Sequence, residues 1–232
     1  ASLKRLQTEY IDLYQLHWPE RSTNMFGVRD FKKNSRDPWE DNFNQILETL
    51  DVLVKEGKIR HIGVSNERAW GLMRYLEEHK INNLPKMITI QNPYSLLNRI
   101  FEGDLAEVSV RENVGLLAYS PLAFGVLSGK YINGTASESA RLNKFPRFAR
   151  YSSQESTTAT KNYMEIAQKF NLSLTQMALA FVNQQPFVRG NIIGATNISQ
   201  LKENIDSVNI HLNDEVLEAI NKVHSQIPNP AP

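Results

Sequence analysis

Five short apolar runs along the chain each end in a cluster of polar residues at the carboxyl side. The runs are IDLYQLHWP (11–19), IRHIGVSN (59–66), MITIQNPYS (87–95), GLLAYSPLAFG (115–125) and RGNIIGATN (189–197). Apolar runs of this length, separated by amphipathic segments, are typical of buried parallel strands. We therefore predict one strand in each run.

Apolar residues at helical spacing predict helices between the strands. In residues 40–56, Phe43, Leu47 and Leu50 share one face, and Gly57 ends the helix. The chain opens in another amphipathic pattern. Further helices are predicted over 67–79, 101–113, 157–170, 174–185, 199–208 and 213–227, the last with Asn213 as its N-cap.

Alternating strands and helices predict an α/β fold with a parallel sheet. An open doubly wound sheet and part of a (β/α)8 barrel both fit, although no G-x-G-x-x-G supports a Rossmann fold. Ligands of such sheets bind beyond the carboxyl ends of the strands. The polar residues expected to converge there are His17, Ser65, Asn66, Gln91, Tyr119, Ser120 and Thr196. The long connections 20–39 and 123–157 follow two of these ends and are expected to act as lids or clamps.

Charge and composition narrow the partners. The 26 Lys and Arg residues balance 25 Asp and Glu residues, without a basic run, so we expect neither nucleic acid nor a membrane surface as a partner. The absence of cysteine excludes disulfides and thiol catalysis and fits the cytoplasm, where we expect the protein. A small, mildly polar ligand remains. Because the chain lacks an initiator Met and opens inside a helical pattern, we expect a fragment of a longer protein.

Each candidate in the first strands has a structural alternative. His17 is either a hydrogen-bonded core residue or a site imidazole that donates to a substrate carbonyl. Ser65 and Asn66 suit a site and, equally, the cap of the following helix. Tyr119 is either a core aromatic residue or a ring that stacks on a flat ligand.

The segment from Gly125 to Lys130 contains glycines and a lysine but lacks the spacing of a P-loop. It still suits phosphate contact through backbone N–H groups. Arg141, Arg147 and Arg150 can add charge-assisted bonds, although solvated loop charge is the better interpretation for the last two.

The last strand runs directly onto a helix N-terminus, which is a favourable place for an anion. Gln200, Glu203 and Asn204 share one face of that helix, either as ligand contacts or as a solvated surface. Other chemistries lack their motifs: there is no G-x-S-x-G, no zinc-ligand spacing among the histidines and no pair of strand-end carboxylates. We predict no metal site.

Taken together, five motifs in order resemble the aldo-keto reductase family, in the branch of the bacterial Tas-like proteins and the potassium-channel β-subunits. The motifs are DLYQLHWP, GKIRHIGVSN, IQNPYSLLNR, LLAYSPLAFGVLSGKY and IIGATNISQLKENI. The resemblance covers residues 1–232 as one partial barrel domain. It implies a (β/α)8 TIM barrel of which strands four to eight are present, while strands one to three, with the family's catalytic aspartate, tyrosine and lysine, are missing.

The resemblance also implies NADP(H) as cofactor, and reduction of a small carbonyl substrate by hydride transfer with a tyrosine as proton donor. His17 corresponds to the catalytic histidine, and Trp18 with the 20–39 loop to the substrate pocket. The residues implied in cofactor binding are Ser65, Asn66, Gln91, Tyr119, Ser120, Pro121, Leu122, Ala123, Phe124, Gly125, Lys130, Arg141, Gly194, Thr196, Gln200, Glu203 and Asn204.

Two alternatives stay open within the resemblance. The first is the cofactor. Many relatives place a Lys or Arg against the 2′-phosphate, whereas this chain has Ala195 and Gln200 in that motif. The channel subunits have the same glutamine and use NADP, so we favour NADP over NAD. The second alternative to a reductase is an NADP-binding, redox-sensing regulatory subunit with little turnover. The chain alone is expected to be inactive, and its oligomeric state is left open.

Overall fold

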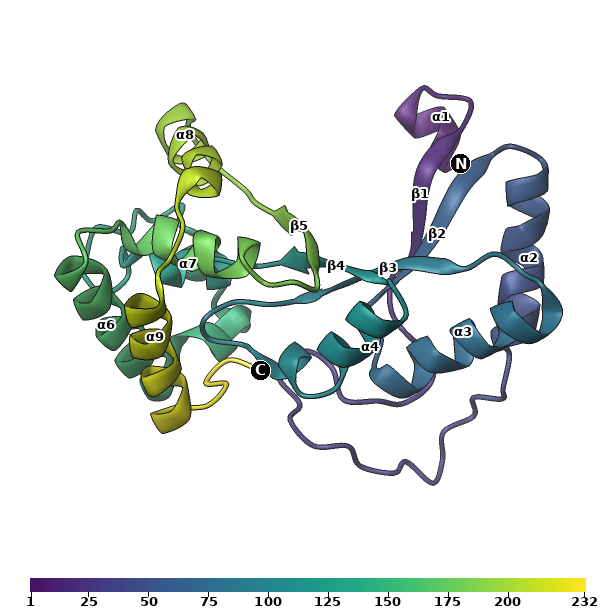
Figure 1. Ribbon diagram of the computed structural model, residues 1–232, viewed down its shortest axis with the longest axis horizontal. Coiled ribbons are helices and arrows are strands. Elements are labelled where there is room, and N and C mark those ends of the chain that lie inside the picture. Colours follow the sequence, from purple (N-terminus) through teal and green to yellow (C-terminus); the bar gives the residue numbers. More distant parts are fainter. The chain divides into compact units, whose positions relative to one another are not determined.

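The computed structural model describes the backbone of residues 1–232 and the side chains of residues 1–146 and 150–232. Its strands form one sheet in the order β1-β2-β3-β4-β5 (Figure 1). They are β1 (Ile11–Leu16), β2 (Ile59–Ser65), β3 (Met87–Pro93), β4 (Gly115–Tyr119) and β5 (Val188–Ile192). β1 pairs with β2, and β2 with β3, in parallel. The five predicted strands and the α/β class are confirmed.

The helices predicted between the strands are also present. They are α1 (Ser2–Leu6), α2 (Phe43–Lys55), α3 (Ala69–Asn82), α4 (Leu105–Arg111), α6 (Gln154–Lys169), α7 (Leu174–Asn183), α8 (Ile198–Asp206) and α9 (Asp214–Gln226). Asn213 caps α9 as predicted, because its side chain accepts a hydrogen bond from the Val216 backbone N–H at 3.1 Å. Within the described part of the chain, no helix combines the length and the apolar character needed to cross a membrane.

The connection 123–157 differs from the long loop that the sequence predicts. It contains η2 (Ala123–Ser128), α5 (Arg141–Lys144) and η3 (Pro146–Ser152) before α6 begins. Two more short turns, η1 (Ile100–Glu102) and η4 (Ser207–Asn209), adjoin α4 and α8. Segments of three to seven residues are too short to show helical periodicity, so the hydrophobic pattern gave no sign of them.

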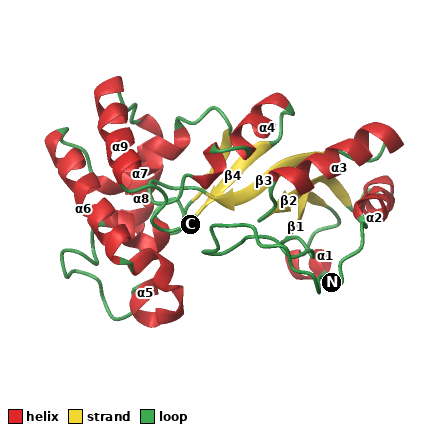
Figure 2. Cartoon of the chain, turned by 90° about the horizontal axis from the view of Figure 1, so that it is seen from below, coloured by secondary structure: helices red, strands yellow, loops and turns green.

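The chain forms two compact units. The N-terminal unit comprises residues 1–25, 29–92 and 104–116, and the C-terminal unit comprises residues 26–28, 93–103 and 117–232. In the N-terminal unit, α2, α3 and α4 follow one another along one side of the strands (Figure 2). Its core is apolar, with Leu47, Ile62, Leu72 and Met87 almost completely buried.

The C-terminal unit is mainly helical, and α6 packs against both α7 and α9 (Figure 2). Tyr163, Met177 and Ile220 lie in its core without solvent exposure. The last residues are also fixed, since the Ala231 backbone N–H donates to the Leu97 carbonyl at 3.1 Å and Ala231 is fully buried.

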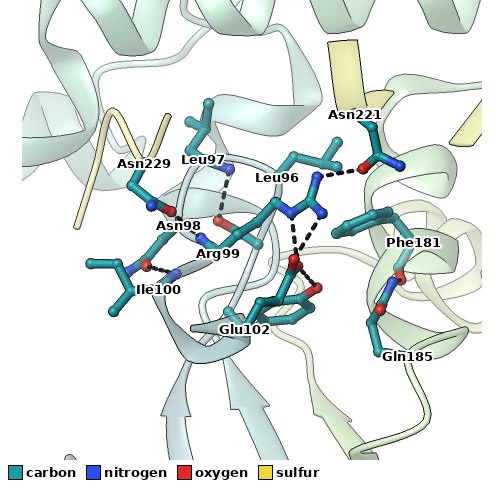
Figure 3. Close-up of polar contacts among 12 residues, drawn as sticks. Leu96, Leu97, Asn98, Arg99, Ile100, Glu102, Phe181, Gln185, Asn221 and Asn229 are labelled. Carbon is teal, nitrogen blue, oxygen red and sulfur yellow. Dashed lines mark hydrogen bonds and ion pairs between the residues drawn. The ribbon is translucent and has the colours of Figure 1, made fainter. Parts of the chain in front are cut away.

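A polar cluster in the C-terminal unit holds the segment that follows β3 (Figure 3). The Arg99 guanidinium donates two bonds to the Glu102 carboxylate, at 2.7 and 2.8 Å, and a third to the Asn221 amide of α9 at 2.8 Å. It also lies 5.0 Å from the centre of the Phe181 ring. The buried Tyr94 hydroxyl donates to Glu102 at 2.5 Å. We call Arg99, Glu102, Tyr94 and Asn221 the Arg99 cluster.

Candidate functional site

Four of the predicted site residues lie together in the N-terminal unit, where β1, β2 and β3 end. The Asn66 amide donates to the His17 backbone carbonyl at 2.8 Å and to the Ser65 hydroxyl at 3.1 Å. The Ser65 hydroxyl donates in turn to the Gln91 carbonyl at 2.8 Å, which also accepts the Asn66 backbone N–H at 3.0 Å. These bonds join the three strand ends into one shelf, which we define as His17, Ser65, Asn66 and Gln91.

The alternative in which Ser65 and Asn66 cap the following helix is wrong. Arg68 occupies the N-cap position of α3 and makes no side-chain cap bond. Asn66 has φ of 56°, a left-handed conformation that asparagine tolerates better than most residues. This turn directs the amide back across the strand ends rather than forward to the helix, and both residues are buried.

His17 follows the last residue of β1, and its side chain is exposed rather than buried in the core. The Trp18 ring, with 53% of its surface exposed, lies 4.2 Å from the imidazole between ring centroids. The imidazole therefore lies beside a large aromatic surface and is accessible to solvent. Such a side chain is available for hydrogen bonding to a ligand.

The C-terminal unit contains a cavity of about 540 Å³. Ligand sites for small molecules commonly measure roughly 300–1,000 Å³, so the volume suits a cofactor-sized molecule. Its walls are the end of β4, the η2 segment, the end of β5 and α8. The predicted residues that line it are Tyr119, Ser120, Pro121, Leu122, Phe124, Gly125, Lys130, Arg141, Gly194, Thr196, Gln200, Glu203 and Asn204. Ala123, predicted with them, is fully buried and does not line the cavity.

The backbone after β4 is unusual. Ser120, Ala123 and Phe124 have φ of 54°, 48° and 56°, and Gly125 has φ of 89°. Left-handed conformations in residues other than glycine cost energy and cluster at ligand sites. A Cβ atom on Gly125 would lie 2.7 Å from the Lys130 ammonium nitrogen, so only glycine lets the lysine head group lie over this turn.

Two cations line the cavity, Lys130 and Arg141. The Arg141 guanidinium lies 4.6 Å from the centre of the Phe124 ring, which fixes it beside the left-handed turn. Arg150 donates to the Tyr151 hydroxyl at 2.9 Å, whereas the side chain of Arg147 lies outside the described residues. Burial raises the pKa of Tyr119 to about 12, against an opposing effect of Arg150, so the ring at this wall is neutral at physiological pH.

At the other wall, side chains of α8 bond to the loop that joins β5 to α8 and to the N-cap of α7. The Gln200 side-chain oxygen accepts both the Thr196 backbone N–H and the Thr196 hydroxyl at 3.0 Å. The buried Asn204 amide donates to the Gly194 carbonyl at 3.2 Å. Glu203 accepts the Ser173 hydroxyl at 2.5 Å. The alternative of a freely solvated helix face does not describe these three residues.

Several lining residues were missed by the sequence analysis. They are Ser128, Thr175, Ile192, Ile193 and Ala195. The two isoleucines and Ala195 belong to a predicted strand run, and their order in the motif could have placed them. Thr175 comes from α7 and had no local signal, because the packing of α7 against η2, β5 and α8 brings it to the cavity.

Comparison with known proteins gives one family. The family model described as "Aldo/keto reductase family" matches residues 1–225. The chain is 51% identical, over 236 residues, to "Protein tas" of Escherichia coli (strain K12), covering 100% of the chain and 66% of that protein. It is 36% identical to an "Aldo-keto reductase" of Babesia bovis, covering 97% of the chain and 84% of that protein. It is 28% identical to the "NADH-specific methylglyoxal reductase" of Escherichia coli (strain K12), covering 92% and 59%. The chain thus spans about two thirds of the length of Protein tas.

Proposed function

Because the chain belongs to the aldo/keto reductase family, we propose that the protein it forms is an NADP(H)-dependent oxidoreductase that reduces aldehydes or ketones to alcohols. Members of this family generally use nicotinamide cofactors. The observation that carries the proposal is the cavity of the C-terminal unit, with the left-handed turn 120–125 at one wall and the Gln200–Asn204 face at the other. Both walls consist of residues of this chain.

The lining of the cavity fits a dinucleotide phosphate. A turn of left-handed residues presents backbone N–H groups to an anion, and Lys130 and Arg141 add positive charge beside it. Tyr119 offers a neutral ring for stacking. Gln200, Glu203 and Asn204 would contact the adenosine end, while Ser65, Asn66 and Gln91 would hold the nicotinamide carboxamide.

When bound, the nicotinamide cofactor supplies a hydride to the carbonyl carbon. His17 would donate a hydrogen bond to the carbonyl oxygen and orient it toward a tyrosine proton donor outside these 232 residues. The bond from Asn66 to the His17 carbonyl fixes the backbone from which the imidazole projects. Trp18 and the 20–39 loop would line the carbonyl substrate and exclude water from it.

We favour NADP over NAD because Gln200 stands where the channel subunits, which use NADP, also have a glutamine. One relative is named as NADH-specific, so the preference for NADP needs a direct test. The 232 residues hold only one of the four catalytic residues that the family resemblance assigns, so we expect them to bind cofactor without turnover on their own. We place the protein in the cytoplasm.

Titration of the chain with NADPH and with NADH, followed by cofactor fluorescence, tests the cofactor. We expect saturable binding with tighter affinity for NADPH. The reaction is then tested with the whole protein that contains these residues. It is mixed with NADPH and each of a panel of aldehydes, ketones and quinones, and the fall in NADPH absorbance is measured. Binding without turnover of any carbonyl would favour the redox-sensing regulatory subunit, and absence of binding would contradict both functions.

A further inference from the structure

A buried ion pair in the N-terminal unit joins two segments that are 46 residues apart. Arg21 and Glu67 are exposed over only 9% and 2% of their surface. The Arg21 guanidinium donates to both carboxylate oxygens, one bond measuring 2.9 Å, in a bidentate arrangement. Bidentate pairs of this kind are strong and geometrically specific, and removal of one partner leaves an uncompensated buried charge.

Glu67 directly follows Asn66 of the shelf, and two further hydrogen bonds fix its position. Its backbone carbonyl accepts the Asn92 amide at 2.9 Å, next to Gln91 at the end of β3. Its carboxylate accepts the Arg68 backbone N–H at 2.6 Å, close to the start of α3, where negative charge is favourable. A group bonded to Glu67 is therefore held in the frame of the shelf.

Arg21 belongs to the connection between β1 and α2, residues 17–42, which begins at His17 and Trp18. Its guanidinium lies 5.0 Å from the Trp70 ring centre and 5.8 Å from that of Phe43. It also fills the space over Gly71, where a Cβ atom would come within 2.4 Å of it. The arginine thus packs between α2 and α3 while it bonds to Glu67.

The same connection is organised internally around Asp37. The Asp37 carboxylate accepts the Ser22 backbone N–H at 2.7 Å and the Trp39 backbone N–H at 3.2 Å. Ser22 directly follows Arg21 in the chain. The ion pair to Glu67 therefore links the hydrogen bonds around Asp37 to the shelf. The exposed tip of the connection has no such bond to Glu67 among the described residues.

We propose that Arg21 and Glu67 are positioning residues that fix the 17–42 connection to the shelf and thereby set the affinity for the carbonyl substrate. This inference rests on the proposed function, which assigns that connection to the substrate side. Because the ion pair lies in the N-terminal unit and the cavity in the C-terminal unit, we expect loss of the pair to change substrate affinity more than cofactor affinity.

The test compares Arg21→Gln, Arg21→Lys and Glu67→Gln with the control Arg60→Gln, which breaks the exposed pair between Arg60 and Asp12. Limited trypsin digestion at Arg29, Lys32, Lys33 and Arg36, which are all exposed, reports the order of the connection without any substrate. Steady-state kinetics of the whole protein with benzaldehyde, and NADPH titration, report substrate and cofactor separately.

We expect Arg21→Gln to raise KM about tenfold while kcat changes by less than about threefold, because misplacement of a substrate wall weakens binding more than chemistry. The same variant should be cut about tenfold faster at residues 29–36, since opening of the connection becomes easier. Arg21→Lys, which keeps the charge without the planar fork, should lie between it and wild type. Arg60→Gln should match wild type.

The outcomes separate this inference from the proposed function. Unchanged cleavage in both Arg21→Gln and Glu67→Gln overturns the anchoring role, whether or not the protein is a reductase. Faster cleavage with an unchanged KM, or with an equal loss of NADPH affinity, overturns the substrate role while the reductase stands. A wild-type protein that binds NADPH but reduces no carbonyl contradicts the proposed function and removes the kinetic part of the inference with it.

Discussion

The shelf of the N-terminal unit and the cavity of the C-terminal unit use polar side chains in opposite ways. In the shelf, the Ser65 and Asn66 side chains donate hydrogen bonds to backbone carbonyls at the neighbouring strand ends. Around the cavity, Gln200 and Asn204 bond to the end of a single strand and leave a hollow beside them. The first arrangement supports the single imidazole of His17, and the second surrounds the cavity. Substitutions in the two places should therefore change different measurable quantities.

The largest separation is expected from His17→Ala in the whole protein. Loss of a group that assists proton transfer should lower turnover of an aldehyde by about 100- to 1,000-fold. The NADPH dissociation constant should stay unchanged, because the proposed function assigns the imidazole to the carbonyl oxygen of the substrate and not to the cofactor. His61→Ala, which removes another exposed histidine of the same unit, is the control. Weaker NADPH binding with normal turnover would reverse the comparison.

The Arg99 cluster of the C-terminal unit should show the next largest effect. Glu102→Gln removes the carboxylate that bonds to Arg99 (Figure 3) and to the Tyr94 hydroxyl, and we expect the free energy of unfolding to fall by about 3 kcal/mol. Glu107→Gln breaks the exposed pair with Arg111 and should cost less than about 0.5 kcal/mol. Urea unfolding of the two variants measures the difference. Equal free energies of unfolding for the two variants would contradict the structural role of the Arg99 cluster.

Gly125→Val tests the cavity wall directly. Its side chain meets the Lys130 head group and strains a left-handed backbone, so the NADPH dissociation constant should rise about 20-fold. Gly134→Val is the matched control, because Gly134 also has a positive φ, of 67°, but nothing lies within 4 Å of its Cβ position. If both variants bind NADPH as wild type does, the left-handed turn is not part of the cofactor site.

Gln200→Ala should have a smaller effect on the same constant. The amide that organises Thr196 at the end of β5 is lost, which should weaken NADPH about fivefold, the value of one ordinary hydrogen bond. Gln168→Ala, on an exposed position of α6, controls for the loss of a glutamine. Unchanged affinity would leave Gln200 as a structural residue of α8.

The smallest effect is a pH dependence at the cavity wall. Burial raises the pKa of Tyr119 from 10.0 to about 12, so the folded state favours the neutral phenol. The stability that this provides is fully present below pH 10 and is lost as the pH rises to about 12. Tyr119→Phe should therefore show a shallower fall in the free energy of unfolding over this range. Tyr10→Phe, on the surface of the N-terminal unit, should keep the slope of wild type.

The strands and longer helices were predictable because each carries enough residues for its hydrophobic period to show. The hydrogen-bond and ion-pair partners of the side chains were harder to predict from the sequence. Ser65 and Asn66 are good caps by composition, and only the positive φ of Asn66 turns the amide toward His17 instead. The short turns after β4 hold too few residues for a pattern. Arg21 and Glu67 look like ordinary surface charges, because nothing local reveals a partner 46 residues away.

The run of left-handed residues after β4 has a kinetic consequence. Ser120, Ala123 and Phe124 adopt these dihedral angles without the freedom of glycine, held in place by the folded unit around them. The conformational entropy of this turn is thus lost during folding and not at the moment of encounter. Under the proposed function, this turn needs little further ordering when the cofactor binds, so we expect variants of this wall to differ in NADPH affinity mainly through the rate of release.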